Sequence, residues 1–312
     1  MPDYRLRLTL TSPLATPLYS GTLFGHLCWI KRLHDGESAL SAWLAEQAHQ
    51  PLLISDALPA DCLPRPLLMS APRPEQAPDE DRRAFIRRLQ QAKTQRQQRW
   101  IKVEDFLALR DQLTEPRLID RLSAAPGAVH SVRQAHNTLN RHTGTTPASG
   151  GLYFMPEDWF DEQARHRDVY VRSELPAATL QQWFSLLGDF GYGRDASLGR
   201  GQFTVTLDTA DPRLFAATGN RLLSLAHGTL SANMHAPFYR LHTHYGKLGG
   251  LYANGARNPF KYPLTLTQPG MTFSPADDGP YGELLTGVHP QYPEICHHAW
   301  HLCLPYTEVA ES

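Results

Sequence analysis

The sequence contains little cysteine and no long apolar run. Its four cysteines, Cys28, Cys62, Cys296 and Cys303, form no C-x-x-C pair and follow unrelated spacings. This pattern argues against a disulfide framework and favours the reducing cytoplasm. No apolar stretch reaches membrane-spanning length, and the first residues, MPDYRLRLTL, are charged and strand-like, unlike a signal peptide. We therefore expect a cytoplasmic protein that makes no contact with a membrane.

An excess of charge is also missing, because 30 Lys and Arg residues nearly balance 31 Asp and Glu residues. The chain lacks the overall positive field of a general nucleic-acid binder, so any RNA or DNA site must be a local patch. Enzyme signatures are sparse as well. The sequence has no G-x-S-x-G, no Ser-His-Asp order and no G-x-x-x-x-G-K-[ST] phosphate loop.

What the sequence does contain is a glycine- and arginine-rich stretch at residues 190–203, FGYGRDASLGRGQF. Its four glycines surround Arg194 and Arg200, after a helical apolar pattern and before a strand pattern. Glycine adopts backbone conformations closed to other residues, and arginine offers phosphate a planar fork of donors. The stretch is typical of a loop that holds a polyanion. A plain tight turn with solvated arginines is the alternative.

Apolar periodicity predicts an α+β fold. It predicts strands at residues 4–11, 52–54, 151–155, 168–172 and 202–207, and helices from Ser20 and at 38–49, 103–113 and 179–187. This order matches a ferredoxin-like βαββαβ unit in residues 1–210, with an inserted helical segment around residues 58–128. Residues 211–312 are strand-rich and poor in helix signal. We therefore predict tandem ferredoxin-like (RRM-like) domains, the second of which is degenerate.

Two further segments are candidates for contacts with a partner. Residues 80–100 are rich in Arg and Gln with a thin apolar face, which predicts an exposed helix that contacts RNA or another subunit, or is simply solvated. Ser20 is a good helix N-cap. The free amides of the following turn, with the hydroxyls of Ser20 and Thr22, therefore form a second anion site or an ordinary cap.

The 15 histidines raise the question of a metal site. Strand alternation places His297, His301 and Cys303 on one face, but a zinc site usually shows closer ligand pairs. Polar strand residues and a buried thiol explain this cluster better, so we predict no metal ion and no cofactor.

A second histidine pair raises the question of nuclease activity. His242 and His244 share a strand face, and with Tyr239 or Lys247 they are candidates for metal-free RNA cleavage by general acid–base catalysis. The basic and aromatic residues fit RNA binding better, because single-stranded RNA is held by phosphate contacts and base stacking.

Five segments in order along the chain resemble the RAMP superfamily of CRISPR proteins, and more narrowly the Csm-type (type III-A) subunits that bind the 5′ handle of the guide RNA. Residues 20–25, SGTLFG, resemble the family's S-D-T-L-F-G, and residues 140–146, NRHTGTT, resemble N-R-x-T-G-T-T. Residues 191–203 resemble the loop G-F-G-K-D-x-S-x-G-K-G-x-F. Residues 245–251, YGKLGGL, and 258–263, NPFKYP, resemble C-terminal motifs of the family.

The chain also departs from the family pattern. Gly21 replaces an acidic residue, Tyr192 replaces a phenylalanine, and Tyr262 replaces a lysine. Arg194 and Arg200 stand where lysines are common, which keeps the positive charge. The change at Gly21 argues against a role for an acidic side chain there.

The resemblance implies a non-catalytic subunit of an antiviral ribonucleoprotein complex. Such a subunit grips the 5′ handle of the crRNA and contacts the large polymerase/cyclase subunit and a backbone RAMP subunit. An alternative is a metal-independent endoribonuclease that processes repeat RNA, as in some RAMP relatives, with His136 or His244 required for cleavage. No catalytic residue is predicted for the leading interpretation. The predicted RNA-binding residues are Gly191, Gly193, Arg194, Gly199, Arg200, Gly201, Ser20, Thr22, His136, Asn140, Arg141, Thr143 and Lys247.

Overall fold

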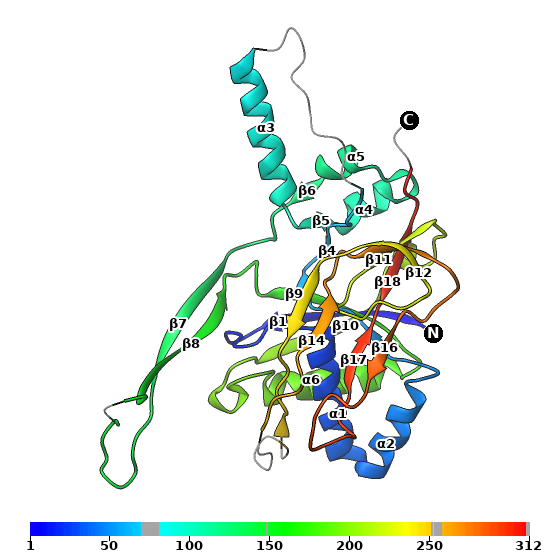
Figure 1. The fold of residues 1–312 in the computed structure, drawn as a ribbon. Coiled ribbons are helices and arrows are strands. Elements are labelled where there is room, and N and C mark those ends of the chain that lie inside the picture. The colour runs from blue at the N-terminus through cyan, green and yellow to red at the C-terminus, as the bar shows by residue number, and fades with distance from the viewer. Residues whose placement is uncertain (70–80, 148, 251, 253–257, 310–312) are drawn as a thin grey trace.

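The computed structural model describes residues 1–312 apart from 70–80, 148, 251, 253–257 and 310–312. Figure 1 shows a body of packed sheets and helices from which a long hairpin and one helix project. The helices are α1 (Ser20–Asp35), α2 (Glu37–Glu46), α3 (Arg82–Gln97), α4 (Val103–Leu109), α5 (Glu115–Ile119), α6 (Ala177–Phe190) and α7 (Pro212–Phe215), with 3-10 turns at Arg110–Gln112 and Ala196–Leu198. The strands are β1 (Asp3–Leu10), β2 (Leu53–Ile54), β3 (Leu58–Pro59), β4 (Cys62–Pro64), β5 (Trp100–Lys102), β6 (Leu122–Ser123), β7 (Val129–Asn137), β8 (Leu152–Phe160), β9 (His166–Arg172), β10 (Phe203–Thr209), β11 (Arg221–Ser224), β12 (Met234–Phe238), β13 (Leu241–His244), β14 (Leu264–Thr267), β15 (Thr272–Pro275), β16 (Gly282–Leu285), β17 (His297–Trp300) and β18 (Cys303–Tyr306).

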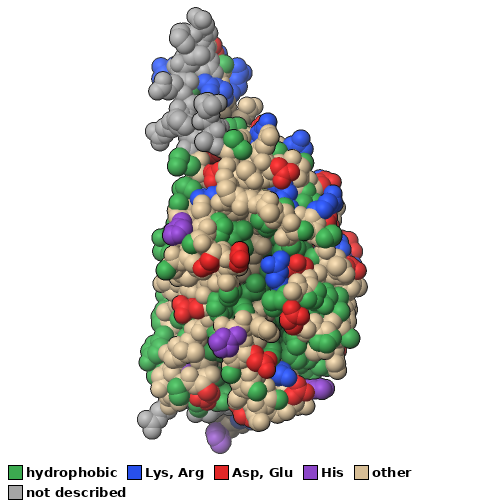
Figure 2. All heavy atoms as spheres, turned by 90° about the vertical axis from the view of Figure 1, so that its right-hand side faces the viewer, with side chains coloured by type: hydrophobic (Ala, Val, Ile, Leu, Met, Phe, Trp, Pro, Cys, Tyr) green, Lys and Arg blue, Asp and Glu red, His purple; other side chains and the backbone are tan. Residues whose placement is uncertain are grey.

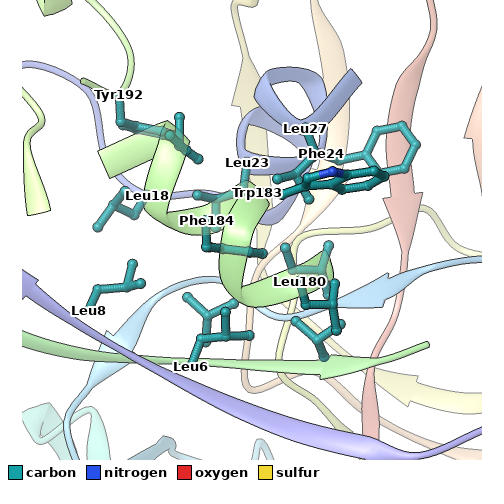
Figure 3. Close-up of a cluster of buried hydrophobic side chains, with 14 of the residues drawn as sticks. Leu6, Leu8, Leu18, Leu23, Phe24, Leu27, Leu180, Trp183, Phe184 and Tyr192 are labelled. Carbon is teal, nitrogen blue, oxygen red and sulfur yellow. The ribbon is translucent and has the colours of Figure 1, made fainter. Parts of the chain in front are cut away.

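The first sheet has the strand order β10-β1-β9-β2, and β3 also pairs with β9. All of these pairs are antiparallel. Its main elements follow the chain order β1-α1-β2-β9-α6-β10, which is the βαββαβ order predicted for this part of the sequence. Figure 3 shows apolar side chains of α1 and α6 gathered with Leu6 and Leu8 of β1 in one buried cluster.

As the sequence predicts, the apolar residues that alternate along β1 form one buried face. Leu6, Leu8 and Leu10 are at most 4% exposed, so one face of the strand is buried. On the opposite face, Arg7 Nε lies 2.8 Å from Oδ1 of the buried Asp168 on β9. α6 also buries the residues predicted from helical spacing, Leu180, Trp183, Phe184 and Leu187.

The last third of the chain is strand-rich, as predicted, which confirms the α+β class. Its sheet has the order β12-β15-β11-β18, and β13 pairs with β14 while β16 pairs with β17. The segment predicted as an insertion packs against this part. Leu63, Ile101 and Phe106 share an apolar core with Leu223 and Leu304. Among the described residues of this segment, helix α3 stands out from the body, with its side chains largely exposed, as predicted for residues 80–100.

The projecting hairpin is formed by β7 and β8, which pair from Val129 and Phe160 at the base to Asn137 and Leu152 near the tip. The sequence predicts no strand at β7, where residues 130–144 read only as polar. The structure corrects this. Both faces of β7 are exposed, so the strand lacks the apolar alternation by which a half-buried strand is predicted.

Candidate nucleic-acid interface

The glycine loop (residues 191–201) follows α6 and needs its glycines. Gly191, Gly193, Gly199 and Gly201 all have φ between 72° and 82°. A Cβ on Gly201 would lie 2.2 Å from the carbonyl oxygen of Tyr192, so the two ends of the loop touch through their backbones. The sequence-based expectation of unusual backbone conformation and close approach is correct, because other residues rarely adopt such φ values.

The backbone amides of this loop are largely used within the protein. The amide of Gly193 donates to His26 Nε2 at 3.1 Å, and that of Arg194 donates to Thr16 Oγ1 at 3.0 Å. The amide of Gly201 donates to the carbonyl oxygen of Pro13 at 2.9 Å. Burial lowers the pKa of His26 to about 4, so its ring is neutral and Nε2 is free to accept. These positions therefore offer no amide cradle to a phosphate.

Both arginines of the loop contact β8 near the middle of the hairpin. Arg200 Nε lies 2.6 Å from Oε2 of Glu157, whose side chain is 5% exposed. Arg194 Nη2 donates to the carbonyl oxygen of Pro156 at 2.5 Å, and Arg194 Nε lies 3.2 Å from Asp195 Oδ2. The sequence gives no sign of these pairs. Arg200 still presents both Nη groups, which make no hydrogen bond with the residues that the structure describes.

The start of α1 differs from the prediction. Tyr19 is the N-cap, and Ser20 is the first helical residue and fully buried. The amide of Ser20 donates at 2.9 Å to Asp56 Oδ1, and Asp56 Oδ2 lies 2.6 Å from His227 Nδ1. An internal carboxylate thus occupies the anion site expected at this helix start. The prediction that Ser20 caps the helix is wrong, whereas Thr22 is partly exposed and hydrogen-bonded to Tyr192.

The electrostatics of Asp56 follow from this arrangement. Burial disfavours its ionised form, but His227 and the bonds from Ser20 outweigh burial and hold the pKa of the carboxyl below its usual value. The pair therefore acts as an internal clamp that joins α1 to the last third of the chain.

Four of the predicted RNA-binding residues, His136, Asn140, Arg141 and Thr143, lie along the hairpin. The ring of His136 stacks on Tyr153, with centroids 5.3 Å apart and planes 12° apart. Asn140, Arg141 and Thr143 are exposed in the turn beyond the strands. With about 3.3 Å per residue over the four or five positions from Pro156 and Glu157 to Leu152, the tip end of the paired strands lies roughly 15 Å from the point that the glycine loop contacts. The glycine loop and the hairpin tip therefore lie at different positions along the hairpin.

Lys247 lies elsewhere. It is exposed, and its backbone forms a bridge with Phe260 of the 258–263 segment. The neighbouring Gly250 packs close to Trp29 of α1, where a Cβ would meet the indole ring at 2.7 Å. The contacts thus associate Lys247 with α1 rather than with the glycine loop.

Gly21 also has a structural reason to differ from the family pattern. A Cβ at this position would lie 2.6 Å from the imidazole ring of His297 and 2.8 Å from the carbonyl oxygen of His298. The ring of His297 fills the space that a longer side chain would need, so an acidic residue does not fit here without rearrangement.

Several exposed hairpin residues were not predicted as site residues. Tyr153, Phe154 and Trp159 are 45%, 48% and 46% exposed, and Arg133 lies over the ring of Phe154 at 5.6 Å. Exposed aromatic rings beside a cation are suited to stacking on nucleobases. The signal was present in the run LYFMPEDWF, where aromatic residues occupy both faces of one strand.

The structure shows where the two histidine clusters predicted from the sequence lie. Rings of Tyr19, His227, His242, His244 and His297 form a connected group with neighbouring centroids 4.4 to 6.3 Å apart. Burial and the neighbouring histidines lower the pKa of His244 to about 4, so this ring is neutral at neutral pH.

In the C-terminal cluster, His297 lies on β17, Cys303 begins β18, and the buried His301 lies between the two strands, so the single strand face expected for the three residues is wrong. His301 lies 2.7 Å from Ser224 Oγ and 3.0 Å from the carbonyl oxygen of Thr229, and burial raises the pKa of the Cys303 thiol. Within the described part of the chain, no group of three or more potential metal ligands comes together.

Comparisons with known proteins identify solved structures that share this architecture. No protein-family model and no curated protein matches the chain. Among solved structures, the chain aligns over 99% of its length with 100% of a chain in the Csm1-Csm4 cassette in complex with cA4, at 17% identity and a TM-score of 0.61. It aligns with 98% coverage of both chains to the same cassette in complex with pppApA, at 18% identity and a TM-score of 0.57.

A third structure contains a different neighbour. In the Csm3-Csm4 subcomplex of the type III-A CRISPR-Cas interference complex, 99% of one chain matches 98% of this chain, at 12% identity and a TM-score of 0.57. Csm4 is common to all three complexes. This chain has the Csm4 fold. The resemblance seen in the sequence is therefore confirmed at the level of the fold.

The three alignments each cover 98% or more of this chain. In the described ranges, no helix has both the length and the apolar character needed to cross a membrane. The four cysteines are free thiols.

Proposed function

We propose that this chain is a non-catalytic RNA-binding subunit of a type III-A CRISPR interference complex and acts in antiviral defence. It would cap the 5′ handle of the crRNA and bridge the large polymerase/cyclase subunit to the backbone RAMP filament. The single observation that carries the proposal is the full-length likeness to Csm4 in complexes with Csm1 and with Csm3. Both kinds of neighbour are proposed for this chain by analogy.

We further propose that the fold consists of two ferredoxin-like domains, residues 1–210 and 211–312. The strand order β10-β1-β9-β2 with α1 and α6 on one face supports the first domain. The four-stranded sheet β12-β15-β11-β18, in a part of the chain where strands predominate, supports a degenerate second domain.

The handle would run along the glycine loop and the hairpin. Arg200 is fixed by Glu157 through Nε, and its two Nη groups make no hydrogen bond with the described residues, which leaves them as donors for a phosphate. His136 and Tyr153 offer stacked rings to splayed bases, and Arg141 adds a charge at the tip. Positioning of an RNA end needs phosphate contacts and stacking, but no acid–base pair.

The test is co-expression with the neighbouring subunits, followed by purification and sequencing of the bound RNA. We expect recovery of crRNA with an intact 5′ handle. Replacement of both Arg194 and Arg200 by alanine should lower this recovery and reduce the salt slope of binding by about 0.7 per lost phosphate contact. Arg213→Ala is the matched control, because Arg213 is exposed on α7 and pairs only with the nearby Asp211 among the described residues. Unchanged guide recovery and slope in the double variant would count against the proposal.

The metal-independent endoribonuclease remains the second candidate, favoured by the ring group around His242 and His244 beside Tyr19. Purified protein is incubated with repeat RNA in EDTA. Specific cleavage that is lost on changing His136 or His244 would favour the nuclease, and inertness at high protein concentration would exclude it. Crosslinking of guide RNA to the 191–201 peptide separates RNA binding from a scaffold that contacts proteins alone.

A further inference from the structure

A cleft of about 860 Å³ opens between the start of α1, the foot of α3 and the turn before β13. Its volume lies in the range of sites that hold small organic groups. It is separate from the glycine loop and the hairpin, since none of their residues lines it. Its lining includes Tyr19, Arg99, Trp100, Arg240, His242 and Gln268.

The charge of this cleft is positive. Arg99 and Arg240 are exposed, and their guanidinium groups make no hydrogen bond or ion pair with the residues that the structure describes. The acidic residue in the lining is Asp56, which is buried and already paired with His227. The two arginines are therefore available to an anionic ligand.

Rings and amides complete the cleft. Tyr19 and His242 present neighbouring rings with centroids 5.4 Å apart, and Trp100, shortly after α3 in the chain, also lines the cleft. Gln268 is held in place because its Nε2 donates to the carbonyl oxygen of Leu241 at 2.9 Å, which leaves its Oε1 as an acceptor. Rings for stacking, amides for base edges and arginines for phosphates are the groups that bind single-stranded nucleic acid.

The positive surface continues from the cleft along α3. This helix begins at Arg82, ends at the cleft with Gln97, and carries six basic and no acidic residues in RRAFIRRLQQAKTQRQ. Its 16 residues span roughly 24 Å at 1.5 Å each. Figure 2 shows Lys and Arg side chains at the upper end of the molecule, where α3 lies, whereas acidic and basic side chains are mixed below. A ligand that reaches from the cleft along α3 is therefore an extended polyanion rather than a free nucleotide.

We infer that the cleft and α3 form a second polynucleotide-binding surface, which takes a single strand with a base in the cleft and its phosphates on Arg99, Arg240 and α3. An acidic protein segment would match the charges but would leave the rings and amides of the cleft without a role. The surface goes beyond the proposed handle site, because it uses different residues. The strand is a second single strand rather than the guide, because no residue of the glycine loop or the hairpin lines the cleft.

The experiment compares guide-loaded complexes that contain the wild-type chain, Arg99→Ala/Arg240→Ala, or the control Arg213→Ala. Guide recovery is measured first, and then the binding of a fluorescent single-stranded RNA, and of the DNA of the same sequence, with no complementarity to the guide. If a separate strand occupies the surface, the double variant should bind the probe at least about 10-fold more weakly, with a salt slope lower by about 1.4 for two lost contacts. Lower guide recovery in the double variant would show that the guide itself occupies the surface and would overturn the inference of a second strand.

Photocrosslinking from a thiouridine-containing probe or guide provides a readout independent of affinity. We expect crosslinks to peptides that contain Trp100 or His242. Unchanged guide recovery and probe binding in the double variant, or crosslinks from these peptides to a neighbouring protein alone, would overturn the inference. The result is separable from the handle proposal, which depends on Arg194 and Arg200.

Discussion

At the residue scale, Glu157 links the two parts of the proposed handle site. Its Oε2 accepts from Arg200 in the glycine loop, and its Oε1 accepts from the indole of Trp159 at 2.9 Å. One carboxylate thus fixes the arginine and the base of the hairpin together. Burial of the Glu157 carboxylate costs desolvation free energy, and its bonds to Arg200 and Trp159 offset this cost only while both partners are present.

We predict that Glu157→Ala lowers the free energy of unfolding by about 2 kcal/mol, because it leaves the Arg200 guanidinium and the Trp159 indole without their acceptor. Arg200 is 26% exposed, so water relieves part of the loss. The control is Glu162→Ala, because Glu162 is 76% exposed in its ion pair with Arg165, and the change should alter stability by less than about 0.5 kcal/mol. Urea unfolding followed by fluorescence measures both, and equal effects of the two variants would refute the role of Glu157.

At the element scale, the packing of α6 against β10 depends on one helical glycine. A Cβ on Gly188 would lie 2.0 Å from the carbonyl oxygen of Phe203, the first residue of β10. A helix and a strand that approach this closely leave no room for a methyl group. The glycine loop connects these two elements, so their distance also sets its shape.

Gly188→Ala should therefore destabilise the protein by about 3 kcal/mol, since the contact is with backbone and α6 must shift away from the sheet. Gly25→Ala in α1 is the matched control. A Cβ there meets nothing within 4 Å, so alanine should leave stability unchanged or raise it by up to about 1 kcal/mol through helix propensity. Chemical denaturation of both variants tests the pair. A Gly188→Ala protein as stable as Gly25→Ala would show that α6 and β10 do not approach as described.

The elements also show what a sequence can predict. β1, α6 and β10 were predictable because each buries one face, which leaves a period in the sequence. β7 was not, because neither of its faces is buried. The glycines of the loop were predictable from backbone chemistry alone. The partners of Arg194 and Arg200 were not, because Pro156 and Glu157 lie on a strand about 40 residues away in the chain, and such contacts leave no local pattern.

At the scale of the whole molecule, buried histidines join distant parts of the chain. His298 Nε2 bonds to the carbonyl oxygen of Leu52 at 2.8 Å, and His301 lies between Ser224 and Thr229. His26 accepts from the glycine loop. Burial lowers the pKa of all three to about 4, from an ordinary value of 6.5. The folded protein keeps these rings neutral under conditions in which the unfolded chain protonates them.

This difference predicts a loss of stability in mild acid. Between pH 6.5 and about 4, His26, His298 and His301 are protonated in the unfolded chain but remain neutral in the folded protein. The free energy of unfolding is therefore highest above pH 6.5 and falls as the pH is lowered. Each histidine should contribute about 1.4 kcal/mol per pH unit. Urea unfolding at pH 7.5, 6.0 and 5.0 measures the slope. His298→Asn should reduce it by about one histidine's share, while His142→Asn at the exposed hairpin tip should leave it unchanged; a flat pH profile would mean that these rings are protonated in the folded protein.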